Sequence, residues 1–282
     1  MSQTVVHARP DRAEPVDDGL WTVDAEPIHP LGFPLPLRMT VVRLANGDLV
    51  LYSPTHHSPA LQRELEALGR IRHLVASNIA HWMFVRDWQL ACPDAVTWGV
   101  PGLSRRAQVR EQGLRVDAEL GPVAPAAWAD ELDQVMVTSG PFVEVDLFHR
   151  ASGTLLVTDL VLNVDGADLP HLLHTAAEIS GILAPNGKAP LHLRLLLKLN
   201  GRAVGRAGER LIAFAPKRVI MCHGHPHEVQ ATDRLREALD WFVGWDGPKR
   251  ALGPVGAGAI GAGLLLGVGL AAAGRRRRRK GR

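Results

Sequence analysis

Short runs in which hydrophobic and polar residues alternate recur along the chain, a pattern of period two that is typical of β-strands. The clearest pair, 39–44 and 49–53, is joined through Asn46-Gly47. Asn-Gly favours tight turns, so this stretch predicts a β-hairpin. Further strands are predicted at 72–77, 95–98, 135–138, 142–148, 154–162 and 218–222.

Helical signals lie between these strands. Ser58 is suited to cap a helix, Pro59 to occupy its first position and Gly69 to end it, so a helix is predicted through Leu68. Other helices are predicted from the Asn78–Trp88 segment to about Cys92, and at 101–112, 169–183, 191–199 and 231–241. Strands that alternate with helices in this order predict a mixed α/β layer fold.

The composition is that of a globular protein with a substantial core, since 46% of the 282 residues are hydrophobic. Residues 1–19 are polar and without periodicity, which predicts a disordered lead-in and no secretory signal. The folded domain is expected at 20–243, followed by a linker at 244–250. Two cysteines without a CxxC pair fit a reducing compartment.

Basic charge is concentrated at the C-terminal end. Residues 275–282 hold seven of the 32 basic residues, which leaves 25 basic against 29 acidic residues in the rest of the chain. The high isoelectric point therefore comes from this basic tail, and the body shows no basic surface typical of nucleic-acid binding. No nucleic-acid partner is expected.

Residues 251–274 contain no charged residue and are long enough to cross a bilayer as a helix. Gly263 and Gly267 form a GxxxG pattern, which favours close packing of two such helices and so a possible homodimer. The same glycine content is also found in flexible linkers. We expect attachment to a membrane through residues 251–282, with the main domain in the cytoplasm; the topology of the basic tail stays open.

Four potential metal ligands follow predicted strands. His81 lies in a loop after one strand, and His149, Asp159 and His223 lie where three others end. One edge of a sheet could gather all four, and imidazole and carboxylate groups suit Zn, Fe or Mn. Such an ion would activate water for hydrolysis. The predicted site is one metal ion held by His81, His149, Asp159 and His223, with Asp159 also counted as catalytic.

These motifs resemble a known family. The order of elements, with a Thr-Asp at one strand end and a His-Gly at another, is similar to the metallo-β-lactamase-like superfamily. Within that superfamily the chain resembles an uncharacterised bacterial and plant family, domain of unknown function 4336. The residues that carry the resemblance, over about 20–243, are Arg38–Leu44, Ser53-Pro54, Asn78 with His81, Phe148–Arg150 with Thr154-Leu155, Thr158–Leu160 and His223-Gly224.

The resemblance implies an αββα sandwich with a metal between its sheets, and cleavage of an ester, amide or phosphoester by activated water. The superfamily's His-x-His-x-Asp-His loop is altered here, because Asn78, Ala80 and Trp82 stand where two histidines and the aspartate are expected. A single metal ion is therefore expected rather than two. Two functions stay open: a metal-dependent hydrolase of unknown substrate, or a non-catalytic binding or assembly module tethered to a membrane.

Overall fold

The computed structural model describes residues 11–167 and 169–244. Its first sheet has seven strands in chain order, of which β1 to β4 are antiparallel and β4 to β7 are parallel. The predicted hairpin is confirmed as β3 and β4. The strands are β1 Ala13–Asp17, β2 Leu20–Ile28, β3 Leu35–Arg43, β4 Asp48–Tyr52, β5 Arg70–Ala76, β6 Val96–Gly99 and β7 Ala118–Glu119.

The second sheet has four strands in the order β11-β10-β9-β8, and β10 and β11 run parallel. Its strands are β8 Leu132–Ser139, β9 Phe142–His149, β10 Thr154–Val157 and β11 Arg218–Met221. Strand β10 ends at Val157, five residues earlier than predicted, so Asp159 lies in a loop just beyond it. The backbone N–H of Val145 donates to the carbonyl of Ser77, 2.8 Å away, and so links the two sheets.

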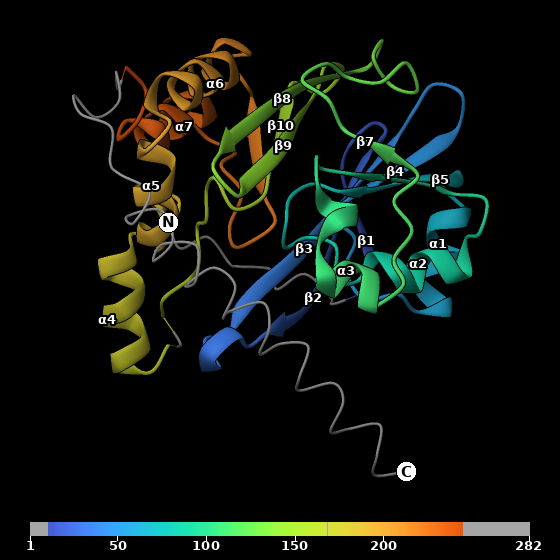
Figure 1. The fold of residues 1–282 in the computed structure, drawn as a ribbon, viewed down its shortest axis with the longest axis horizontal. Coiled ribbons are helices and arrows are strands. Elements are labelled where there is room, and N and C mark those ends of the chain that lie inside the picture. Colours follow the sequence, from blue (N-terminus) through green and yellow to red (C-terminus); the bar gives the residue numbers. More distant parts are fainter. Residues whose placement is uncertain (1–10, 168, 245–282) are drawn as a thin grey trace.

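Helices lie in two groups beside the sheets (Figure 1). α1 Pro59–Glu66, α2 Val85–Ala91 and α3 Ala107–Glu111 accompany the first sheet. α4 His171–Ser180, α5 Leu191–Lys198, α6 Gly201–Ala213 and α7 Ala231–Leu239 accompany the second. The hydroxyl of Ser58 accepts from the N–H of Leu61, which confirms the predicted N-cap of α1.

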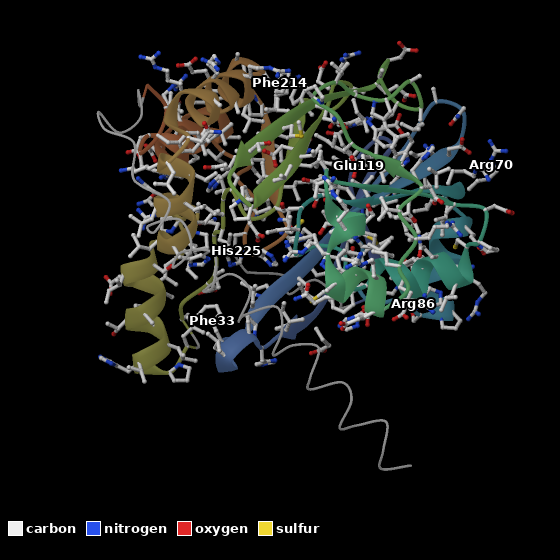
Figure 2. The ribbon with its side chains drawn as sticks, in the orientation of Figure 1. Phe33, Arg70, Arg86, Glu119, Phe214 and His225 are labelled. Atoms are coloured by element: carbon white, nitrogen blue, oxygen red, sulfur yellow. The ribbon has the colours of Figure 1, made fainter. Side chains whose placement is uncertain are left out.

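Successive side chains along the strands of the second sheet point to opposite faces, so this sheet packs against the first sheet on one side and against helices on the other. Leu156 and Ile220 belong to the core shared with the first sheet, whereas Leu155, Val157 and Val219 pack in the core formed with α5, α6 and α7. Both faces of this sheet are buried, which gives the predicted αββα sandwich. Charged side chains such as Arg70 and Arg86 lie at the outer surface (Figure 2).

Two parts of the fold differ from the sequence prediction. Residues 13–17, expected to be disordered within 1–19, form β1 and pair with β2, where Ala13 and Val16 pack against the core of the first sheet. Helix α6 was not predicted, because its glycines lower helix propensity. One of them has a packing role: a Cβ on Gly208 would lie 2.6 Å from the ring of Phe242.

The predicted apolar segment 251–274 and the basic tail 275–282 lie outside the described residues. Among residues 11–167 and 169–244, no helix is both long enough and apolar enough to span a membrane.

Candidate metal centre

The register of two parallel strands places Asp159 beside His223. Val157 of β10 pairs with Met221 of β11, and each of the two site residues follows two positions later. His81 comes from the first sheet, in the loop that follows β5. The centre therefore lies where strands of both sheets end, which is where open sheets commonly place their binding sites.

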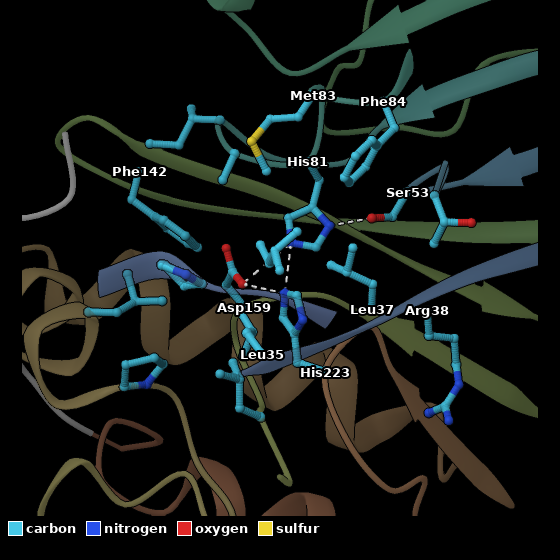
Figure 3. A pocket seen from close by; sticks show the side chains of 18 of the residues that line it. Leu35, Leu37, Arg38, Ser53, His81, Met83, Phe84, Phe142, Asp159 and His223 are labelled. Atoms are coloured by element: carbon cyan, nitrogen blue, oxygen red, sulfur yellow. Dashed lines mark hydrogen bonds and ion pairs between the residues drawn. The ribbon is translucent and has the colours of Figure 1, made fainter. Parts of the chain in front are cut away.

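The donor atoms of these three side chains converge (Figure 3). The Nε2 atoms of His81 and His223 are 3.2 Å apart, and each is 3.4 Å from Oδ1 of Asp159. All three donor atoms lie within 4.8 Å of one another. Only 9% of the His81 side chain and 3% of the His223 side chain are exposed, against 25% for Asp159, so the carboxylate faces the open side.

Hydrogen bonds on the far side of each imidazole determine which nitrogen faces the centre. Nδ1 of His223 lies 2.6 Å from the carbonyl oxygen of Pro36, so this nitrogen carries a proton and donates it. Nδ1 of His81 contacts the hydroxyl of Ser53, which can accept in the same way. With both Nδ1 atoms protonated, neutral imidazoles direct their Nε2 lone pairs at one another and at the carboxylate.

Such a convergence of lone pairs needs a cation between them. Without a metal, a proton takes that place. Burial, the largest single effect, opposes the charged imidazole, but the charge and hydrogen bond of Asp159 together with those of Cys222 exceed it and raise the pKa of His81 to about 10. Burial also opposes ionisation of Asp159, yet His81 and His223 hold the pKa of its carboxyl well below the usual range. Two imidazoles and a carboxylate are a typical ligand set for one Zn, Fe or Mn ion.

Asp159 is held from behind by Asn78 and Glu144. Nδ2 of Asn78 donates to Oδ2 of Asp159 over 2.8 Å, which leaves Oδ1 for the two histidines. The buried carboxylate of Glu144 accepts the backbone N–H groups of Thr158, Asp159 and Leu160 over 2.9–3.1 Å. Oδ1 of Asn78 also accepts the N–H groups of Ala80 and His81. Asn78 therefore organises the loop instead of serving as a ligand.

His149 is not part of this centre, contrary to the sequence prediction. It pairs with Thr154 at the start of β10, because β9 runs antiparallel to β10, whereas Asp159 follows the end of β10. Its Nδ1 lies 2.8 Å from the hydroxyl of Ser152, and burial lowers its pKa. His149 is a buried structural residue at the opposite end of the sheet.

Other histidines have separate roles. His225, labelled in Figure 2, is 45% exposed in its side chain, and its Nε2 lies 3.5 Å from Oδ2 of Asp165. His227 is buried, and this burial is the main reason why its pKa is lowered to about 4. Its backbone forms hydrogen bonds with that of Val219. His192 of α5 lines the cavity beside the centre. Burial lowers its pKa, and the Asp159 carboxylate partly opposes this effect.

Sequence reasoning did not single out Ser53 or Glu144 as supports of the centre. Ser53 has a φ of +56°, which is rare for a residue with a side chain and marks a constrained position. Glu144 and Asp146 are two acids within an otherwise apolar strand, and both are buried. Burial and the charge of Glu144 raise the pKa of Asp146 well above its usual value. Acidic residues within a predicted apolar strand were therefore the sequence signal that could have identified Glu144.

Two sheets between two helical layers give this chain the αββα architecture of the metallo-β-lactamase fold. A family model described as "Domain of unknown function (DUF4336)" matches residues 17–184, more than half of the chain, so the chain belongs to this family. No curated protein sequence matches the chain.

Solved metallo-β-lactamase structures share the fold at low identity. The enzyme from Hirschia baltica is 17% identical, with a TM-score of 0.52 over 86% of this chain and 100% of that chain. The enzyme from Pontibacter korlensis is 12% identical, with a TM-score of 0.54 over 82% and 98%. FIM-1 from Pseudomonas aeruginosa, in its mono-zinc form, is 13% identical, with a TM-score of 0.54 over 82% and 96%.

Proposed function

We propose that the protein is a hydrolase that works with one metal ion held by His81, Asp159 and His223. The observation that carries this proposal is the convergence of two Nε2 lone pairs and one carboxylate oxygen within 4.8 Å. A site with three protein ligands keeps a position open for water, as catalytic metal sites do. The low identity of the metallo-β-lactamases leaves the substrate open.

Each residue has a separate task in this proposal. A bound Zn, Fe or Mn ion would supply Lewis acidity and water activated at neutral pH. Pro36 and Ser53 keep the two imidazoles in the tautomer that binds metal, and Asn78 orients the carboxylate. His192, whose pKa lies below its usual value, is neutral at pH 7 and able to accept a proton in the cavity.

A serine nucleophile is the competing mechanism, because Ser53 contacts His81 and His81 contacts Asp159. Acyl transfer by serine also needs N–H donors for the developing oxyanion. The nearby candidates are occupied: the N–H of Ser53 donates to Val75, and those of Ala80 and His81 donate to Asn78. This arrangement favours Ser53 as a positioning residue for a metal ligand.

The test is hydrolysis by the full-length protein loaded separately with Zn, Fe and Mn. Substrates are para-nitrophenyl esters and bis-para-nitrophenyl phosphate. We expect the wild-type protein to hydrolyse these substrates and a chelator to abolish this turnover. Asp159→Ala should be inactive, whereas His149→Ala should remain active. Turnover that survives the chelator but is lost in Ser53→Ala would replace the metal mechanism with the serine one.

A non-catalytic binding or assembly module is the second candidate. The observation in its favour is the loop after β5, where Asn78 bonds the backbone and Trp82 is buried with 2% exposure, so neither is available to a second metal ion. Absence of turnover from a protein that binds metal stoichiometrically would favour this alternative over the hydrolase.

We also propose membrane attachment through residues 251–282, on the apolar and basic composition of that segment. Flotation of the full-length protein with anionic vesicles, lost on deletion of 251–282, is the expected result. Equal flotation of the deleted protein would contradict this proposal.

A further inference from the structure

A cavity of about 300 Å³ opens beside the metal centre. Its volume is at the lower end of the range for small-molecule sites. Most side chains that line it are apolar, and Figure 3 labels five of them: Leu35, Leu37, Met83, Phe84 and Phe142. Leu193 of α5 also belongs to the lining. A ligand whose body is apolar would therefore be favoured, since it loses little solvation energy on entering.

The polar groups of the lining are mostly occupied. Arg38 forms an ion pair with Asp24 over 2.6 Å and donates to the carbonyl of Gly224. Asp159, the acid of the lining, is engaged by the two histidines of the centre. These groups have little capacity left for a substrate.

Arg106 is different. It lines the cavity, yet its Nε is buried without a hydrogen-bond partner, and no carboxylate among the described residues forms an ion pair with it. Burial lowers its pKa and no neighbouring charge offsets that effect. Arg106 is half-buried as a residue, so water still reaches part of its guanidinium, but the buried Nε–H lacks a partner, which costs free energy that an anion bound in the cavity would recover. Oγ1 of Thr55, also in the lining and 2% exposed as a residue, has no partner either.

We propose that the substrate is a small anion with an apolar body, and that Arg106 binds its anionic group while the scissile bond lies at the metal centre. A carboxylate or phosphate would fit, because a guanidinium offers parallel N–H donors to two oxygens. Thr55 supplies a further hydroxyl to the same ligand. This assignment depends on the hydrolase proposed above and names the substrate class of that site.

Two esters that differ only in the terminal group test it with the full-length, metal-loaded protein: para-nitrophenyl hexanoate and the mono-para-nitrophenyl ester of adipic acid. The measured quantity is the ratio of kcat/KM for the adipate ester to that for the hexanoate ester. Arg106→Gln is expected to lower this ratio about ten- to hundredfold, because the terminal carboxylate of the adipate ester then loses a charged hydrogen-bond partner. Arg105→Gln, an exposed neighbour outside the lining, should leave the ratio unchanged. An unchanged ratio in Arg106→Gln overturns the assignment.

Binding without turnover separates this inference from the proposed function. Octanoate and octanol are titrated into the wild-type protein and Arg106→Gln, and binding is followed by displacement of a fluorescent dye. Arg106→Gln should lower the affinity for octanoate by at least about tenfold more than it lowers the affinity for octanol. If neither ester is turned over but this difference is found, the hydrolase fails and the anion site stands. Equal effects on octanoate and octanol contradict the anion site, whatever the turnover.

Discussion

Replacement of Glu144 by glutamine tests how the fold positions Asp159. Oε1 of Glu144 accepts the N–H groups of Thr158 and Leu160, and Oε2 accepts from Asp159 and Asn78. A glutamine amide can keep one pair of these bonds, but its NH₂ group then faces the other two donors. Two charge-assisted bonds are lost at a side chain that is fully buried.

At about 1.5–3 kcal/mol for each such bond, Glu144→Gln should lower the free energy of unfolding by about 3–6 kcal/mol. In a domain of this size that corresponds to a fall in Tm of roughly 6–24 °C. Metal affinity should also fall by about ten- to hundredfold, because the loop that carries Asp159, together with Asn78, loses two of its four hydrogen bonds to residue 144.

Circular dichroism melting of the metal-free protein and competition with a chromogenic chelator measure the two effects. Glu131→Gln is the control, because Glu131 accepts only the N–H of Ala45 with its carboxylate, at an exposed position. Its Tm should change little. An unchanged Tm in Glu144→Gln would refute the reasoning, and a lowered Tm with unchanged metal affinity would restrict Glu144 to a structural role.

Three further predictions follow from the site. Gly224→Ala should lower Tm and metal affinity more than Gly47→Ala, since both have positive φ but only at Gly224 would a Cβ collide, 2.0 Å from the carbonyl oxygen of Asn163. Ser53→Ala should weaken metal binding about ten- to hundredfold, measured by chelator competition, through loss of the hydrogen bond to His81; unchanged affinity would contradict this. The pKa of His81, raised from 6.5 to about 10, stabilises the metal-free fold fully below pH 6.5, and this stabilisation is lost as the pH rises through 10. Metal binding between these values should release close to one proton, seen by calorimetry in buffers of different ionisation enthalpy, and no release would show that His81 is not a ligand.

Local sequence signals predicted the parts of the fold that depend on local geometry. The Asn46-Gly47 turn and the Ser58 cap are confirmed because each depends on a few neighbouring backbone groups. The sequence also predicted that Asp159 and His223 would meet, because both lie near the ends of predicted apolar strands, but their common offset of two residues from Val157 and Met221 became visible only in the structure.

Relations between elements were predicted less well. His149 ends β9, and the four residues between β9 and β10 are too few for a parallel crossover, so the two strands are antiparallel and His149 lies at the end of β10 opposite to Asp159; the sequence carried this signal, but the prediction did not use it. Helix α6 packs closely on Phe242 and Val243, which follow α7 and would have to shift to admit a Cβ at Gly208, so its stability depends on tertiary packing that local propensity does not show. Glu144 acts on a loop 14 to 16 residues later, through a turn of the chain that no motif describes.

Metal content tests the central claim most directly. The full-length protein is purified without chelator from medium supplied with Zn, Fe and Mn, and metal per chain is measured by inductively coupled plasma mass spectrometry. We expect about one ion per chain in the wild type and in His149→Ala, and loss of the ion in His81→Ala, Asp159→Ala and His223→Ala. Equal metal content in all five proteins, or none in the wild type, would contradict a metal centre at these three residues.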